Sequence, residues 1–298
     1  MKIVTFKIGE QRKVGIVDDG AATVRPFKLS SDQAQQGIQH LIELQLSDGE
    51  LPATASPIPL DALVIEAPLP RPRRNVFCVG KNYYDHAREF SSSGFDSSAA
   101  QAVVPEFPII FSKVPEAVIG SGSFVEFDPA VSSAIDYEVE LAVIIGKPGR
   151  GITRENALDH VWGYTIVNDV TARDLQGRYS QWLVGKSQDT FCPMGPVAVT
   201  RDDLDLDDTR LRTWVNDELR QDSNTGLLIF DVPTIIATIA AGVTLLPGDV
   251  IATGTPAGVG IGFKPPRYLQ DGDLVRCQID GIGSLENGIR EISKGQCP

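Results

Sequence analysis

Short runs in which apolar and polar residues alternate recur along much of the chain, and this period of two is typical of strands. The first run alternates through Ile3, Thr5 and Lys7 and leads toward a turn predicted at residues 18–20. Further strand patterns occur at residues 14–17, 76–79, 108–113, 162–168, 213–220 (a hairpin) and 272–289. Helical patterns are fewer, so strands are expected to dominate the fold.

Helices are predicted over residues 31–49, 153–160 and 231–242. Each begins with residues able to cap it, namely Ser31 with Asp32, Thr153, and Asp231. The inward-facing residues of the third helix are expected to be Ile235, Ile236 and Ile239. Between the first helix and the strand at 76–79, residues 51–74 are rich in proline, which indicates a linker. We therefore predict a small N-terminal domain, with its linker, at 1–70 and a main domain at 71–298.

The most informative stretch is an apolar strand pattern at residues 135–146 that contains three acids. Because side chains alternate along a strand, Asp136, Glu138 and Glu140 are expected on one face. Carboxylates gathered on one face repel one another and resist burial, whereas the apolar run at 141–145 belongs in a core. Either a solvent-facing edge or a hard divalent cation could resolve this conflict. Asp169, at the end of the strand pattern at 162–168, could be a further ligand or a turn former.

His86 and Glu89 follow the strand at 76–79 and, three residues apart, share a face of the predicted helical turn. A carboxylate that orients an imidazole is the arrangement of a general base. The alternative is a surface pair of little consequence. Residues 90–106 are small, polar and without period, and we predict that they form a mobile loop that acts as a lid.

Lys186 stands between two apolar runs, at 182–184 and 191–193. This setting suits a lysine that binds an anion or stabilises an oxyanion, but also one whose stem packs while its charge reaches water. A phosphate-binding loop would need glycine at position 180, where Ser180 stands. The glycine-rich segment 246–260 is expected to approach a ligand with its backbone, although it lacks the glycine spacing of a dinucleotide site.

Charge and composition narrow the classes of partner. A net charge of −12 argues against nucleic acid and anionic membranes, while a small acidic substrate stays compatible if a local cation receives it. No apolar stretch predicts a membrane span or a signal peptide, and no Cys-x-x-Cys pair occurs, so a cytoplasmic location with reduced thiols is expected. With three histidines in the chain, oxygen ligands and hence Mg²⁺ or Mn²⁺ are favoured.

Five strings, taken together and in order, resemble the fumarylacetoacetate hydrolase (FAH) superfamily. They are Gly80–His86, Asp136–Leu141, Gly163–Gln176, Gly185–Ser187 and Pro247–Pro256. The resemblance spans roughly residues 71–290 and is greatest to members that have a short N-terminal domain. It implies a β-rich α+β fold, with a mixed β-roll or sandwich as the catalytic domain, a small α+β domain before it, and a homodimer.

The resemblance also assigns roles to residues. It implies Glu138, Glu140 and Asp169 as ligands of Mg²⁺ or Mn²⁺, and it leaves Asp136 outside the ligand set. His86 with Glu89 would activate a water, and Lys186 would stabilise an oxyanion. The residues implied at the substrate site are Lys81, Tyr83, Arg173, Gln176 and Thr255. The larger founding enzymes have a further carboxylate ligand seven positions before the histidine, where this chain has Val79.

The implied substrate is a small anionic 2-oxo acid. The activity that we expect is hydrolysis of the C–C bond of an acylpyruvate through a metal-stabilised pyruvate enolate. The same site would suit decarboxylation of oxaloacetate, its keto–enol tautomerisation, or an isomerase of the 2-hydroxyhepta-2,4-diene-1,7-dioate type. A non-catalytic protein that binds its ligand through the metal is the remaining alternative, and the His86–Glu89 pair argues against it because a binder needs no base.

Overall fold

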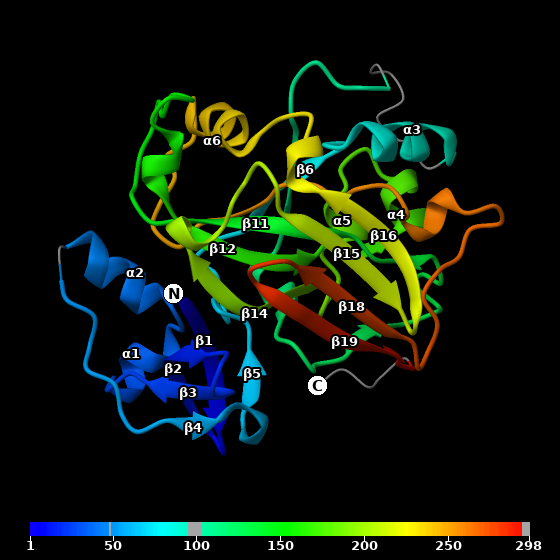
Figure 1. Ribbon diagram of the computed structural model, residues 1–298. Helices are drawn as coiled ribbons and strands as arrows, with labels where there is room; N and C mark the ends of the chain where they lie inside the picture. Colours follow the sequence, from blue (N-terminus) through cyan, green and yellow to red (C-terminus); the bar gives the residue numbers. More distant parts are fainter. Residues whose placement is uncertain (48, 95–102, 294–298) are drawn as a thin grey trace.

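The computed structural model describes residues 1–47, 49–94 and 103–293, and its architecture is strand-rich α+β, as the sequence predicts. Most strands belong to one 12-stranded sheet, and a five-stranded sheet shares a hydrophobic core with it. A short two-stranded ribbon pairs β10 (Ile135–Asp136) with β13 (Thr171–Ala172). Figure 1 shows the strands of the smaller sheet crossing in front of the larger one.

The large sheet mixes antiparallel and parallel neighbours. In spatial order it contains β4 (Ile58–Pro59), β3 (Thr23–Pro26), β2 (Gln11–Asp18), β1 (Lys2–Ile8), β14 (Cys192–Thr200), β12 (Val161–Asn168), β11 (Val139–Ile145), β17 (Val250–Ala252), β6 (Val76–Gly80) and β7 (Ile109–Lys113). Off this path, β5 (Val64–Glu66) pairs with β1, and β8 (Val118–Ile119) pairs with β14. The small sheet has the order β16 (Glu218–Asn224), β15 (Arg210–Val215), β18 (Leu274–Ile279), β19 (Gly283–Glu291) and β9 (Val125–Phe127).

Strand β11 is buried on both faces, which explains its continuous apolar run. Val139 and the alternate residues up to Ile145 face the core shared with the small sheet, whereas Ala142 and Ile144 belong to a second core on the opposite face. The acidic strand predicted at 135–146 is therefore two strands, β10 and β11, interrupted at residues 137–138. Its acids are buried, which excludes the solvent-facing edge.

The N-terminal elements, β1 to β5 with two short helices, lie together beside the rest of the chain (Figure 1). The single helix predicted over 31–49 is wrong: α1 (Ser31–Gln35) and α2 (Gln39–Leu46) are separated at Gly37, which adopts a φ of +61°. The N-cap is Ser30, whose hydroxyl accepts the backbone N–H of Gln33 while that residue's side chain bonds back, forming a capping box.

The proline-rich segment contains ordered strands as well as connections. Within it, β4 pairs with β3 and β5 pairs with β1, so part of the expected linker is bound to the N-terminal strands. Strand β1 also pairs with β14 through Lys2 opposite Val199 and Ile3 opposite Ala198. One sheet thus continues across the predicted boundary, and the division into 1–70 and 71–298 stays a prediction.

The helix predicted over 153–160 is also wrong, since only the 3-10 turn η3 (Ala157–His160) forms there. Thr153 caps nothing; its backbone N–H donates to the side chain of Asn156. The third predicted helix is confirmed as α6 (Val232–Ala240), with Asp231 accepting the N–H of Thr234 as its cap. Other helical elements are α3 (Tyr84–Ser92), α4 (Arg173–Arg178), α5 (Leu183–Lys186), and the 3-10 turns η1 (Leu60–Ala62), η2 (Pro115–Ala117), η4 (Arg201–Asp203), η5 (Thr225–Leu227) and η6 (Gly260–Gly262).

Three further expectations concern loops, membranes and cysteines. The lid predicted at 90–106 begins within α3, and residues 95–102 lie outside the described residues. Among the described helices, none is long and apolar enough to cross a membrane. The three described cysteines, Cys78, Cys192 and Cys277, are free thiols in buried positions.

Gly163 marks a close approach of β12 to β14, because a methyl group added there would lie 2.1 Å from the carbonyl oxygen of Val199. We expect Gly163→Ala to lower the free energy of unfolding by about 1–3 kcal/mol, since the strand backbones must separate to admit the methyl group. Gly242→Ala is the matched control: no atom lies within 4 Å of its added methyl group, so its effect should stay within about 0.5 kcal/mol. Urea unfolding of both variants checks this, and equal stabilities would contradict the close approach.

Candidate active site

Three carboxylates meet because of the register between β11 and β12. Val139 pairs with Asn168, so Glu138 and Asp169 stand together just beyond the paired residues, and the Asp169 N–H donates to the Glu138 carbonyl oxygen at 2.9 Å. Glu140 is the next residue of the strand on the side of Glu138. One oxygen from each of the three carboxylates lies within 4.8 Å of the others. The structure thus brings the three suggested metal ligands to one buried point.

The charge of Glu140 is the least compensated of the three. Burial, followed by the negative charges of Asp169 and Glu138, raises the pKa of Glu140 well above its ordinary value. Its carboxylate accepts the N–H of Gly254 at 2.8 Å. Burial also opposes ionisation of Glu138, but the nearby cations outweigh burial and lower the pKa of that carboxyl. A cluster of oxygen donors with excess negative charge fits a hard divalent cation such as Mg²⁺ or Mn²⁺.

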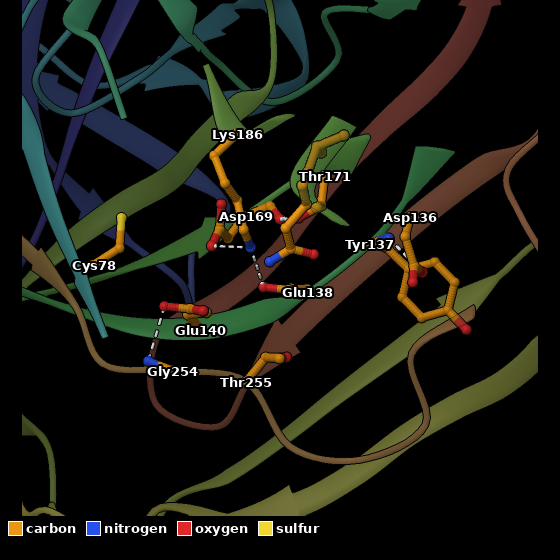
Figure 2. A network of polar contacts seen from close by, with 12 residues as sticks. Cys78, Asp136, Tyr137, Glu138, Glu140, Asp169, Thr171, Lys186, Gly254 and Thr255 are labelled. Atoms are coloured by element: carbon orange, nitrogen blue, oxygen red, sulfur yellow. Dashed lines mark hydrogen bonds and ion pairs between the residues drawn. The ribbon is translucent and has the colours of Figure 1, made fainter. Parts of the chain in front are cut away.

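Two buried lysines neutralise part of this charge. The Lys186 ammonium lies 2.7 Å from Glu138 Oε2 and 2.7 Å from Asp169 Oδ2, as Figure 2 shows. Lys113 Nζ lies 2.7 Å from the other oxygen of Asp169 and donates to the main-chain carbonyl oxygens of Val170 and Lys186. Lys186 is 1% exposed, so its charge faces the acids and the alternative of a lysine reaching for water is excluded. Although burial opposes it, the two carboxylates raise the pKa of Lys186.

Asp136 binds protein groups in place of a metal. Its carboxylate accepts the Arg173 Nε–H at 2.9 Å and the backbone N–H groups of Gly260 and Ile261 at 2.7 and 3.1 Å. Arg173 in turn lies 2.6 Å from Glu138 Oε1 through NH1. Asp136 therefore fixes both this guanidinium and the glycine-rich segment, which agrees with its place outside the ligand set.

The His86–Glu89 pair sits on α3 at the same cavity and is no exposed surface pair. Nδ1 of His86 lies 3.3 Å from Glu89 Oε2, and His86 is 5% exposed. The glycine-rich segment holds Glu89 from the other side, because the Gly258 N–H donates to its carboxylate at 3.1 Å. At Gly262, just beyond that segment, a methyl group would lie 1.7 Å from Glu89 Oε1, so the backbone also comes close to Glu89 there. The glycine-rich segment thus fixes the Glu89 carboxylate, and this carboxylate orients the His86 imidazole through Nδ1.

These groups surround a cavity with about 280 Å³ of empty space, including its open mouth. The predicted site residues that line it are Lys81, His86, Glu138, Glu140, Arg173, Gln176, Lys186 and Thr255. Asp169 and Glu89 stand behind the lining, in contact with Lys186 and His86 respectively. Tyr83 does not line the cavity: it is 3% exposed, and its hydroxyl has no hydrogen-bond partner among the described residues. A direct contact between Tyr83 and substrate therefore has no support in this arrangement.

Two parts of the site are not predicted from the sequence. Lys113 ends a short apolar strand, as many exposed lysines do, and no local signal shows that its charge reaches Asp169. The aromatic residues Phe90, Phe111 and Trp182 also line the cavity, although they come from three separate segments. Only the tertiary contacts reveal these four residues.

Comparisons with known proteins identify the family of the chain. The model of the family described as Fumarylacetoacetate (FAA) hydrolase C-terminal matches residues 75–290. The chain belongs to this family. It is 49% identical to oxaloacetate tautomerase YisK of Bacillus subtilis over 231 residues, which are 77% of this chain and 74% of that relative.

Solved structures show the same fold over nearly the whole chain. A fumarylacetoacetate hydrolase from Exiguobacterium antarcticum has a TM-score of 0.82 at 41% identity, with 98% of this chain and 100% of that chain covered. A 2-hydroxyhepta-2,4-diene-1,7-dioate isomerase from Mycobacterium marinum has a TM-score of 0.76 at 34% identity, with 99% and 100% covered. The FAH fold expected from the sequence is confirmed. The relatives are a tautomerase, a hydrolase and an isomerase by name, so they support enzymatic function and leave the reaction open.

Removing the charge of Lys113 should destabilise the protein strongly. We expect Lys113→Met to lower the free energy of unfolding by about 3–5 kcal/mol, because it leaves a buried carboxylate without one of its cations. Lys2→Met is the matched control: its partner Asp19 is 62% exposed, and exposed pairs contribute about 0–1 kcal/mol. Chemical unfolding of both variants measures the difference, and a Lys113→Met protein as stable as the control would contradict the pairing.

Glu140 gives a test of the metal centre that does not depend on activity. A raised folded-state pKa means that the ionised group destabilises the fold at neutral pH, so Glu140→Gln should raise the melting temperature of the metal-free protein. The same change removes an anionic ligand and should abolish most of the stabilisation by added Mg²⁺ or Mn²⁺. Thermal melts with chelator and with each metal check both effects. Exposed Glu155→Gln is the control, and unchanged metal stabilisation in Glu140→Gln would reject the site.

Proposed function

We propose that this protein is a tautomerase that interconverts the keto and enol forms of oxaloacetate or a similar small 2-oxo diacid, with a divalent cation bound by Glu138, Glu140 and Asp169. The observation on which the proposal depends is the oriented His86–Glu89 pair at a cavity that also contains the acids and Lys186. Tautomerisation requires a base and a stabilised oxygen, and both are present. The relatives add support, because one is named an oxaloacetate tautomerase and another an isomerase.

The cavity suits a small anionic substrate in an otherwise acidic protein. Lys81, Arg173 and Lys186 line it beside Glu138 and Glu140, so local cations are available to an anionic substrate although the whole chain has a net charge of −12. The empty space amounts to about 280 Å³ with the open mouth included, so the room inside the cavity is smaller still. A compact diacid is therefore favoured over a long one.

His86 is the residue that we assign to proton transfer. With Nδ1 oriented by Glu89, the other ring nitrogen can accept a proton from C3 of the substrate, and negative charge then develops on the C2 oxygen. Lys186 has three N–H donors, of which two are directed to Glu138 and Asp169, so the third can donate to that oxygen. A divalent cation, when bound, would supply Lewis-acid polarisation of the 2-oxo group. Return of a proton to the oxygen completes the enol.

Hydrolysis of an acylpyruvate is the second candidate, and the orientation of His86 by Glu89 favours it too. The same pair could deprotonate a water that attacks the distal carbonyl, and Lys186 could stabilise the oxyanion. This was the activity first expected from the sequence, and the comparisons support tautomerisation better. The two reactions differ in whether a C–C bond breaks.

His86→Ala separates the two reactions that need a base, tautomerisation and hydrolysis, from decarboxylation. Tautomerisation and hydrolysis both need the base, so we expect each to fall by about 10²–10⁴-fold. Decarboxylation of oxaloacetate needs no base for an attacking water and should be largely spared. Glu138→Gln should depress all three by weakening the cation site. Ultraviolet absorbance of the oxaloacetate enol measures tautomerisation, pyruvate release from acetylpyruvate measures hydrolysis, and CO₂ release from oxaloacetate measures decarboxylation. Each rate is compared with a blank of metal without protein.

His40→Ala is the matched control, because this histidine lies on α2 and does not line the cavity. Equal losses of tautomerisation and decarboxylation in His86→Ala would mean that His86 positions substrate and does not transfer a proton. A wild-type protein that cleaves acetylpyruvate but does not speed tautomerisation would replace the first candidate with the second.

A further inference from the structure

Three aromatic rings form a wall along one side of the cavity. Phe90 comes from α3, Phe111 from β7, and Trp182 from the residue before α5. The Trp182 ring lies edge-on to both others, with centroid distances of 5.9 Å to Phe90 and 5.1 Å to Phe111. All three rings line the cavity, and together they form the aromatic wall. Such edge-to-face packing holds each ring in place.

The indole of Trp182 has little freedom to retreat. A methyl group added at Gly80, at the end of β6, would lie 2.6 Å from Cζ3 of this ring, so the ring already rests against the strand backbone. Trp182 is 7% exposed, and its neighbours in the cluster, Val259 and Ile261, are buried as well. A larger substrate could not displace the ring without disturbing several packed groups.

The wall and the charged groups are neighbours within one small space. Lys186 Nζ lies 5.0 Å from the Phe111 ring centroid, and Lys81 Nζ lies 5.5 Å from that of Phe90. Lys81 also has a φ of +54°, a conformation that costs energy for a non-glycine residue and is frequent at functional sites. When the 2-oxo acid group of a substrate binds among the charged residues, the group attached to C2 therefore has little room between them and the aromatic wall.

We propose that Trp182 is a specificity-determining residue that limits the size of the group attached to C2 of a 2-oxo acid. This inference rests on the proposed function, since it concerns which 2-oxo acids the same site admits. Small substituents such as the carboxymethyl group of oxaloacetate fit in front of the aromatic wall, and a phenyl group does not. Discrimination in apolar pockets amounts to roughly 10–200-fold for one methylene, so a ring should be rejected at least as strongly.

Binding of two acids that cannot enolise tests the limit without any turnover. Glyoxylate has a small substituent at C2 and benzoylformate has a phenyl ring, and calorimetry with the Mg²⁺-loaded protein measures the dissociation constant of each. We expect wild type to prefer glyoxylate by at least about tenfold. Trp182→Ala should reduce this preference at least about tenfold, and Trp182→Phe should give an intermediate value. Every variant keeps the backbone carbonyl of residue Trp182, which accepts the backbone N–H of Lys186 at 3.0 Å.

Tyr268→Ala is the matched control, because Tyr268 packs against the same hydrophobic cluster as Trp182 and does not line the cavity. It should keep the wild-type preference. Trp182→Leu provides a second truncation should Trp182→Ala fail to fold, and circular dichroism with a metal titration establishes that each variant is intact. A folded Trp182→Ala or Trp182→Leu variant with the wild-type ratio of the two dissociation constants overturns the inference. A wild type that binds both acids equally also overturns it. A wild type that prefers glyoxylate but does not speed oxaloacetate tautomerisation would contradict the proposed reaction alone. A wild type that binds neither acid would contradict the substrate class.

Discussion

Acidic and basic side chains are buried together at one end of β11, and their mutual neutralisation is the constraint on which the rest of the site depends. The acids are Asp136, Glu138, Glu140 and Asp169, and the cations are Lys113, Arg173 and Lys186. Each cation contacts at least one acid, so no cation can be removed without leaving a carboxylate exposed to a low-dielectric interior. The acids outnumber the cations by one, and Glu140 is the acid whose ionisation is opposed. A divalent cation would more than offset this excess of one negative charge and would favour ionisation of Glu140.

The large sheet makes this arrangement possible. Strand β11 lies between β12 and β17, so its neighbours supply Asp169 on one side and the Gly254 N–H on the other. The glycine-rich segment then crosses the cavity and uses backbone N–H groups to hold Glu89 and Asp136. Backbone donors cost no side-chain entropy and cannot be displaced without moving the loop. Helix α3, which contains His86 and Glu89, and the charged cluster are therefore held in one frame.

Family membership explains why the reaction is not decided by the charged residues. Relatives with this fold are named as a tautomerase, a hydrolase and an isomerase. The proposed base would suit each of these reaction types, because each can develop negative charge on a substrate oxygen. The aromatic wall, which lines the same cavity, is better placed to select a substrate by its size.

The sequence by itself determined the strand-rich character, most strand positions, the helix at 231–242 and, through resemblance, the family and the set of three acids. These features depend on local periodicity, capping chemistry or short strings of residues, which a sequence displays directly. It misplaced the helix at 31–49, which Gly37 divides with a φ of +61°, and the helix at 153–160, where only a 3-10 turn forms. Only the tertiary structure decided the pairing of Lys113 with Asp169, the role of Asp136 and the contact of Trp182 with Gly80. Such contacts join residues far apart in the chain, and burial, not residue type, turns a lysine or an aspartate into part of a site.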